Sequence, residues 1–189
     1  IVLHGVLGLI GAAIGRLAHV ARPLNWKAFF AIDLVVLTLL LIGAGGLVTG
    51  NRAGLAVPDW PNSFGSNMVM LPLTKMTGGI FYEHAHRLIA TLVGFVCLTL
   101  AIYVSFAARR KSIIIWAWAI GLAVLTQAIM GGMRVTGSSE AVEGLRATVD
   151  LAPAPSLNPA AYQPSIGFAV AHGFFAHFVL AGLITLAVL

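Results

Sequence analysis

The sequence predicts an all-α membrane protein, a polytopic four-helix bundle made of two duplicated helical hairpins. Composition is the first observation, because 59% of the 189 residues are hydrophobic and only 9% are charged, with a mean hydropathy of +0.97. The second is a set of apolar stretches near the ~20 residues that a helix needs to cross a bilayer. The third is an inexact internal repeat, in which His86 recurs as His172 after 86 residues (172 − 86).

Four membrane spans are expected. In chain order they are Ala28–Val48, Gly79–Ala107, Ser112–Met133 and Ser165–Leu189. The preceding stretch is apolar but interrupted by three ionisable residues, so residues 1–22 are expected to form a partial additional helix of unknown role. Residues 23–189 are then the four-helix transmembrane domain. The chain lacks an initiating Met and stops within an apolar run, so we expect it to be a fragment of a longer chain.

Basic residues indicate how the spans are oriented. Arg22 and Lys27 precede the first span, and Arg109–Lys111 link the second to the third, so these ends are expected in the cytoplasm. The long loops Thr49–Thr77 and Arg134–Pro164 are then outside. We therefore expect a multi-pass protein of the cell membrane, here a bacterial inner membrane. The net charge of +5 is dispersed without a basic stripe, so nucleic acid is not an expected partner.

The repeated histidines indicate a site shared by the two hairpins. A glycine pair that starts at Gly45 recurs at Gly131 with the same offset of 86 residues (131 − 45). His86 and His172 each lie 7 residues inside their expected spans (86 − 79 and 172 − 165), which puts both about 10 Å below the outer surface. Ionisable residues at such depth are costly and mark functional sites.

Haem iron is the occupant that this pair favours. Two imidazoles at one depth in a four-helix bundle are an iron-ligand pair, and a twofold axis along the membrane normal would bring His86 and His172 face to face. Zinc is less consistent, because no third or fourth ligand with ordinary spacing accompanies them. The alternative for both residues is a histidine hydrogen-bonded inside the bundle.

The neighbouring polar residues are assigned by helical geometry. His84 lies two residues before His86, about 200° around the helix, so the two cannot both face the bundle centre. His86 is taken as the inward residue because it alone obeys the repeat offset. His177 is expected to pack or to support a ligand rather than bind iron. Cys97 is expected to be a small packed residue.

Glu83 and Arg87 allow two interpretations. Their i,i+4 spacing predicts an ion pair at the helix start. The functional alternative places Glu83 beside the bound macrocycle as a catalytic group that handles protons or positions a substituent. Arg87, together with Arg52 or Arg134, would then bind the carboxylates of haem. Anchoring at the membrane surface is an equally good explanation of the two loop arginines.

Two sets of motifs resemble the haem A synthase family. In the first hairpin they are Gly-Gly-Leu-Val-Thr-Gly at 45–50, Ala-Gly-Leu-Ala-Val-Pro-Asp-Trp-Pro at 53–61 and Tyr-Glu-His-Ala-His-Arg at 82–87. In the second they are Gln-Ala-Ile-Met-Gly-Gly at 127–132 and Ala-His-Gly-Phe-Phe-Ala at 171–176. The resemblance covers roughly residues 28–189. The combination of Pro-Asp-Trp-Pro with Glu-x-x-His-Arg is the specific part.

The resemblance implies a membrane oxidoreductase that converts the ring D methyl group of haem O to the formyl group of haem A, for terminal oxidase assembly. The positions that match the family's haem ligands are His86 and His172, and Glu83 matches a residue of its substrate site. Full-length members have two such halves, with haem b as an electron relay in one and substrate haem O in the other. This chain resembles the amino-terminal half. The implied partners are haem O, membrane lipid, a second half or second copy, haem O synthase and an electron-transfer protein.

Three features depart from the family pattern. The first outer loop lacks the cysteine pair that many members carry there. The second outer loop, with the Pro-rich segment 152–159, is longer than expected and is predicted to be flexible. The family offers no counterpart for the segment before Arg22. In the first outer loop, Asp59, Trp60 and Pro61 are expected either to cap the site or to form a turn, with Trp60 alternatively an interfacial anchor.

Two other functional classes remain open at this stage. A b-type cytochrome would keep one haem on the same two histidines for electron transfer and would not need Glu83. A transporter would also explain parallel repeats with polar residues inside the membrane. Against a transporter, no expected span is broken at mid-membrane by paired Gly and Pro.

Overall fold

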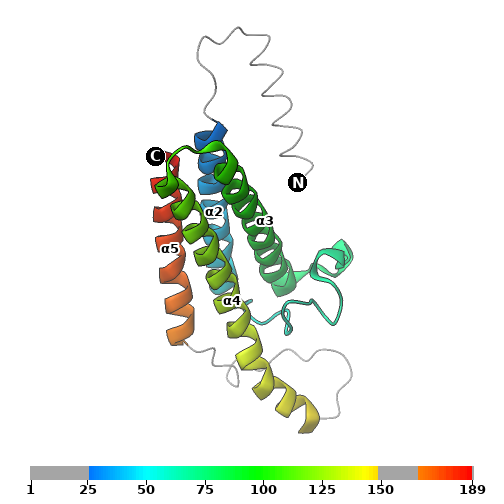
Figure 1. The fold of residues 1–189 in the computed structure, drawn as a ribbon. Helices are drawn as coiled ribbons and strands as arrows, with labels where there is room; N and C mark the ends of the chain where they lie inside the picture. The colour runs from blue at the N-terminus through cyan, green and yellow to red at the C-terminus, as the bar shows by residue number, and fades with distance from the viewer. Residues whose placement is uncertain (1–25, 149–165, 189) are drawn as a thin grey trace.

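The structure is a computed structural model that describes residues 26–148 and 166–188, with side chains described for 26–135 and 167–188. Within these ranges the protein is all-α and contains no strand. Its long helices are α2 (Trp26–Gly50), α3 (Gly78–Ala107), α4 (Lys111–Thr148) and α5 (Ile166–Val188), with two short 3₁₀ helices, η1 (Met68–Met70) and η2 (Leu73–Lys75), between α2 and α3 (Figure 1). Each long helix contains a segment long and apolar enough to cross a membrane. The expected all-α bundle is thus confirmed. The partial helix expected in residues 1–22 lies outside the described residues.

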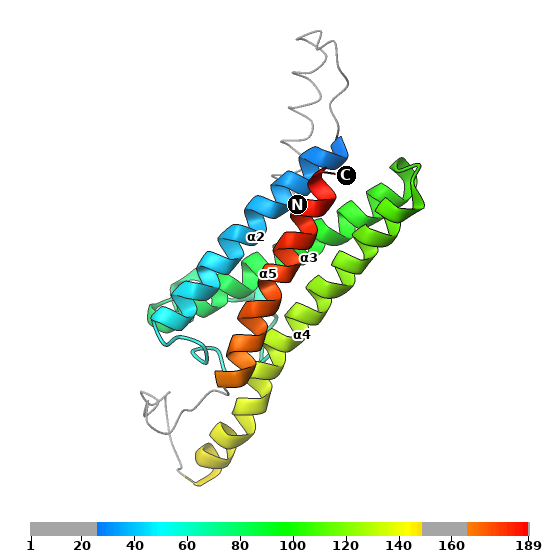
Figure 2. The ribbon, with the colours of Figure 1, turned by 90° about the vertical axis from the view of Figure 1, so that its left-hand side faces the viewer.

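The four helices form a bundle in which each packs against two others. α2 packs against α3 and α5, and α4 packs against the same two helices. In Figure 2, α5 is in front between α2 and α4, and α3 is behind them. Because successive helices alternate in direction, α3 and α5 run parallel to each other on one diagonal of the bundle, and α2 and α4 occupy the other. A twofold relation between the hairpins α2–α3 and α4–α5 accounts for this pattern.

Two tryptophans of α4 form hydrogen bonds to the neighbouring helices α5 and α3. The indole N–H of Trp116 donates to the carbonyl oxygen of Gly182 on α5 at 3.1 Å, and that of Trp118 donates to the Ser105 hydroxyl on α3 at 2.9 Å. Hydrogen bonds between helices hold a bundle together where lipid offers no hydrophobic driving force.

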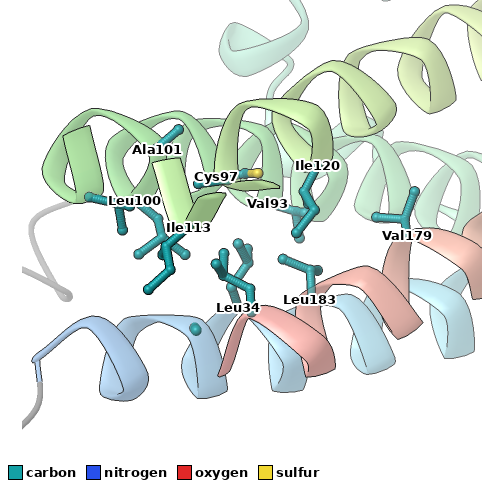
Figure 3. Close-up of a cluster of buried hydrophobic side chains, with 13 residues drawn as sticks. Leu34, Val93, Cys97, Leu100, Ala101, Ile113, Ile120, Val179 and Leu183 are labelled. Atoms are coloured by element: carbon teal, nitrogen blue, oxygen red, sulfur yellow. The ribbon is translucent and has the colours of Figure 1, made fainter. Parts of the chain in front are cut away.

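The apolar core is confined to the half of the bundle near the Ala108–Arg110 link. All four long helices contribute buried residues to it (Figure 3): Ala31 and Leu34 of α2; Val93, Cys97, Leu100, Ala101 and Val104 of α3; Ile113, Ala117 and Ile120 of α4; and Val179, Leu183 and Leu186 of α5. Cys97 is buried within it, as a small packed residue. The outer half, which carries both repeated histidines, contributes no buried residue to this cluster. Close packing therefore fixes the inner half, and the outer half is the part available to a site.

The outward faces of the helices are strongly apolar. Large exposed residues include Leu40 on α2, Phe95 on α3, Leu122 on α4 and Phe178 on α5. In water such a surface would promote association, whereas in lipid it is the expected helix exterior. Together with the apolar spans, these faces indicate a membrane protein.

The helix ends agree with the expected spans except at α4. We expected this helix to stop at Met133 and a loop to begin at Arg134, but α4 continues to Thr148, so the expectation was wrong for residues 134–148. Hydropathy carries no signal once the apolar stretch ends. The continuation contains Ala, Glu, Leu and Arg, which favour helix, and no proline occurs between Arg134 and Pro153. The remainder of the second outer loop lies outside the described residues.

Candidate functional site

The two repeated histidines lie on the diagonal helices of the bundle, His86 on α3 and His172 on α5. Their imidazoles are near enough to interact electrostatically. In both rings Nδ1 is buried and has no hydrogen-bond partner. A buried polar atom without a partner costs about 1–3 kcal/mol. Two such atoms at equivalent positions therefore indicate a place where something else binds.

Each ring lies against a glycine of the other helix in its own hairpin. A Cβ built on Gly45 of α2 would come within 3.1 Å of Cε1 of His86, and one built on Gly131 of α4 would come within 3.1 Å of Cε1 of His172. The two contacts are related by the repeat offset of 86 residues, as the histidines are. The missing side chains let each imidazole lie close to the backbone of its neighbouring helix.

Arg134 on α4 adds a positive charge to the same region. Its charge acts on both imidazoles and on Glu83. Its guanidinium lies against Gly54 of the first outer loop, where an added Cβ would be 3.0 Å from Nη2. Arg134 therefore connects the second hairpin to the loop of the first, beside the histidine pair.

Glu83 and Arg87 form the ion pair expected from their spacing, with Arg87 Nη2 2.6 Å from Glu83 Oε1. The other carboxylate oxygen of Glu83 accepts the backbone N–H of Val57 at 2.8 Å. Arg87 also donates to the carbonyl oxygens of Val57, Asp59 and Asn62. Glu83, Arg87 and Val57 are buried, whereas Asp59 is partly buried and Asn62 is exposed. The pair thus holds the first outer loop onto the start of α3.

This arrangement is the ion-pair alternative of the two considered from the sequence. The guanidinium of Arg87 is directed to Glu83 and to loop carbonyls, and both oxygens of Glu83 accept protein donors. The functional alternative, in which Glu83 is a reacting group and Arg87 binds a cofactor carboxylate, stays a prediction. Among the loop arginines considered as alternatives, Arg134 is the one near the histidines. Arg52 is exposed at the turn that follows α2.

The first outer loop closes over the outer end of the bundle. Ala53, Leu55 and Val57 are buried. Trp60 packs against Gly132 of α4 so closely that a Cβ there would lie 2.5 Å from indole Cδ2. Asp59 forms a turn, because its carboxylate accepts the backbone N–H groups of residues 64 and 65 at 2.8 and 2.7 Å. The turn expected for this motif is therefore present, and its role as a cap over a binding site stays a prediction.

The other two histidines among the described residues face away from the pair. His84 is buried on the loop side of α3, where its Nδ1 lies 3.2 Å from the Ser63 hydroxyl oxygen. His177 is exposed on α5, with Nδ1 2.8 Å from the carbonyl oxygen of Gly173 in the preceding turn. The geometric choice of His86 over His84 therefore agrees with the structure.

Sequence reasoning missed Gln127 as part of the site. Its amide Nε2 donates to the backbone carbonyl oxygen of His172 at 2.8 Å, across the α4–α5 interface. Its Oε1 is buried without a partner. The only available signal was its place one turn before Gly131 in a motif of the second hairpin. Gln127 fixes the backbone that carries His172.

The donor set fits a haem better than a bare metal ion. Among the described residues, no group of three or more His, Cys, Asp or Glu side chains gathers as a metal site, which a protein-bound zinc ion would require. A haem supplies four nitrogens of its own, and its iron needs only two axial ligands. His86 and His172, whose Nδ1 atoms have no hydrogen-bond partner, are the two residues that would hold the iron. Arg134 provides a cation for an acidic substituent.

Comparison of this chain with protein-family models, with curated proteins and with solved structures finds no match in any of the three.

Proposed function

We propose that this chain binds haem between His86 and His172 and belongs to a membrane oxidoreductase of the haem A synthase type. The observation that carries haem binding is the symmetric pair of imidazoles. They lie on diagonal helices, each with a buried, unpartnered Nδ1 and each against a glycine. Protein ligands at equivalent places in two repeats are what a shared, centrally held group requires.

The residues of the chain supply position and exclusion of water. His86 and His172 would hold the haem iron, with Gly45 and Gly131 allowing the rings to approach the neighbouring helices. Arg134 would bind an acidic substituent of the porphyrin. A bound haem supplies the redox chemistry, which the protein directs by ligation, burial and charge.

The substrate part of the proposal rests on contacts between separate motifs. The Pro-Asp-Trp-Pro segment and the Glu-x-x-His-Arg segment, which carry the resemblance, meet in the structure through Arg87 and the carbonyl of Asp59. Trp60 of the first motif packs on Gly132 of the second hairpin. We propose haem O as substrate, with its methyl group converted to formyl. In this oxidation the formyl oxygen comes from water and the electrons and protons are released, so an electron-transfer partner and a haem b relay in a second half or second copy belong to the proposal as electron acceptors.

A second candidate is a b-type cytochrome that transfers electrons without substrate chemistry. The observation that favours it is the engagement of Glu83, whose two oxygens hold Arg87 and Val57. On that view Glu83 is a positioning residue. In the enzyme Glu83 would hold the first outer loop over the substrate. In the cytochrome the same contacts would only stabilise the fold of that loop.

The two candidates separate in one experiment. The full-length protein is expressed in membranes together with a source of haem O, and extracted haems are identified by mass. The proposal expects haem A in membranes that contain the unmodified protein. No haem A is expected with His86→Ala or with His172→Ala. Glu83→Gln keeps the shape of the side chain, so it should retain bound haem and lose haem A. Bound haem without haem A from the unmodified protein, in the presence of haem O and electron acceptor, would instead identify a cytochrome.

Cell membrane location is part of the proposal. The apolar spans support a multi-pass protein, and the basic Arg109–Lys111 link supports a cytoplasmic position for that end. With this orientation the histidine pair lies near the outer face. Haem O synthase would deliver a lipophilic substrate through the membrane, which makes lipid and that enzyme the expected neighbours.

A further inference from the structure

An exposed apolar segment of the first outer loop has no role in the haem site. We call residues 64–76 the apolar loop; it contains η1 and η2. Val69, Met70 and Leu73 expose 67%, 75% and 81% of their surface, and Phe64 is also exposed. Exposed apolar residues gathered in one short segment are characteristic of a binding surface.

The apolar loop satisfies several of its own backbone donors. Asn67 caps η1, with its side-chain oxygen accepting from Val69 N at 2.9 Å and its carbonyl accepting from Met70 N at 2.9 Å. In η2, Lys75 N donates to the Pro72 carbonyl oxygen at 2.9 Å and Met76 N to the Leu73 carbonyl oxygen at 3.0 Å. Backbone groups paired in this way can enter a less polar medium at reduced cost.

The loop is fixed beside the bundle instead of hanging from it. Leu71 is buried, and η1 packs against α3. In Figure 1 the blue-green segment lies to the side of the first turns of α3. The segment that carries the apolar residues therefore lies beside the bundle, at the level where α3 begins.

The start of α3, against which η1 packs, is also apolar and exposed. Phe81, in the first turn of α3, is half exposed and packs edge-to-face on Tyr82 with ring centroids 5.5 Å apart. Aromatic residues at this level are typical of the membrane–water interface. No acidic residue occurs between Asp59 and Glu83, and Lys75 is exposed.

We propose that the apolar loop inserts into the outer leaflet at the lipid headgroup level, with Val69, Met70 and Leu73 among the acyl chains and Lys75 at the phosphates. Packing beside the exposed apolar start of α3 and the absence of acidic groups favour lipid over a protein partner. The apolar loop belongs to the first outer loop, which Glu83 and Arg87 hold to α3 through Val57. Insertion of the apolar loop would therefore set the depth at which the first outer loop covers the bundle.

Fluorescence quenching in reconstituted vesicles tests this insertion. Val69→Cys and Leu73→Cys are labelled with an environment-sensitive dye in the otherwise unchanged protein, whose Cys97 is buried. Asn62→Cys, an exposed position of the same loop outside the apolar segment, is the matched control. Vesicles of phosphatidylcholine and phosphatidylglycerol carry either a lipid-linked quencher or iodide in the buffer.

The proposal expects dyes at positions 69 and 73 to be quenched several-fold more by the lipid-linked quencher than the dye at 62, and less by iodide. Equal iodide quenching at all three positions would place the loop in water and overturn the proposal. Protection of 69 and 73 from both quenchers would mean that protein covers the loop, which also overturns it. Unchanged dispersity of each variant in detergent verifies folding.

Discussion

Gly131 of α4 lies so close to the imidazole of His172 that a Cβ would approach Cε1 to 3.1 Å, tighter than an ordinary contact. Gly45 and His86 have the same relation in the first hairpin, at the same calculated distance. Two independent glycines so placed indicate that the approach of ring to helix is a requirement of the repeat. The site is therefore a symmetric pair of helix–imidazole contacts.

Added volume at these glycines should displace the rings. We expect Gly45→Val and Gly131→Val each to weaken haem binding by about tenfold or more, because overpacking costs roughly 1–3 kcal/mol. Haem titration followed by absorption measures the effect. Gly46→Val is the control, since nothing lies within 4 Å of a Cβ at Gly46. Equal losses in all three variants would show that helix propensity, not ring displacement, is responsible.

Arg87→Lys should loosen the first outer loop. A lysine can keep one interaction with Glu83 but cannot reach the several carbonyls that the guanidinium fork binds. Trypsin cleavage after Arg52 and Lys75 should become several-fold faster in detergent. Arg110→Lys, at an exposed position of the opposite link, should leave the rate unchanged. Unaltered cleavage of Arg87→Lys would mean that other contacts hold the loop.

The contact between Trp60 and Gly132 predicts energetic coupling. Gly132→Ala should lower stability by about 1–3 kcal/mol because its Cβ overlaps the indole. In a Trp60→Ala background the same change should cost much less, and thermal unfolding of the four proteins gives the coupling. Gly173→Ala, which adds a Cβ in open space on α5, is the control. If the stability losses of Gly132→Ala and Trp60→Ala simply add in the double variant, the two residues are not coupled, which would contradict a contact between the indole and Gly132.

The orientation of the chain can be tested by thiol labelling of intact cells. We expect Asn62→Cys to react with an impermeant reagent from outside and Arg110→Cys to react only after the membrane is opened, because basic links remain in the cytoplasm. Both side chains are exposed. The unmodified chain is the control, since its buried Cys97 should not react. Labelling of Arg110→Cys from outside, with Asn62→Cys reacting only after the membrane is opened, would show that the topology is the opposite of the one proposed.

The helices and the proximity of His86 to His172 could be predicted from the sequence, because hydropathy and the repeat are local or periodic signals. The Glu83–Arg87 pair was accessible as well, through its i,i+4 spacing. The continuation of α4 to Thr148 was not, since beyond the apolar stretch only weak helix propensity distinguishes helix from loop.

The loop contacts could not be predicted either. Arg87 binds backbone carbonyls, which every residue offers, so no sequence pattern identifies the partners. The fit of Trp60 on Gly132 depends on how two hairpins approach. Gly45 and Gly131 were recognised as marks of the repeat, but their contact with the histidines required the packing angle of each hairpin.

Axial ligation by both histidines is the central claim, and absorption and electron paramagnetic resonance of the purified, haem-loaded protein test it most directly. A low-spin signal is expected with both imidazoles present, because two nitrogen ligands complete the iron coordination. His86→Ala and His172→Ala should each abolish it, leaving high-spin or absent haem, whereas His177→Ala should leave it intact. A low-spin signal that survives loss of either His86 or His172 would contradict the account.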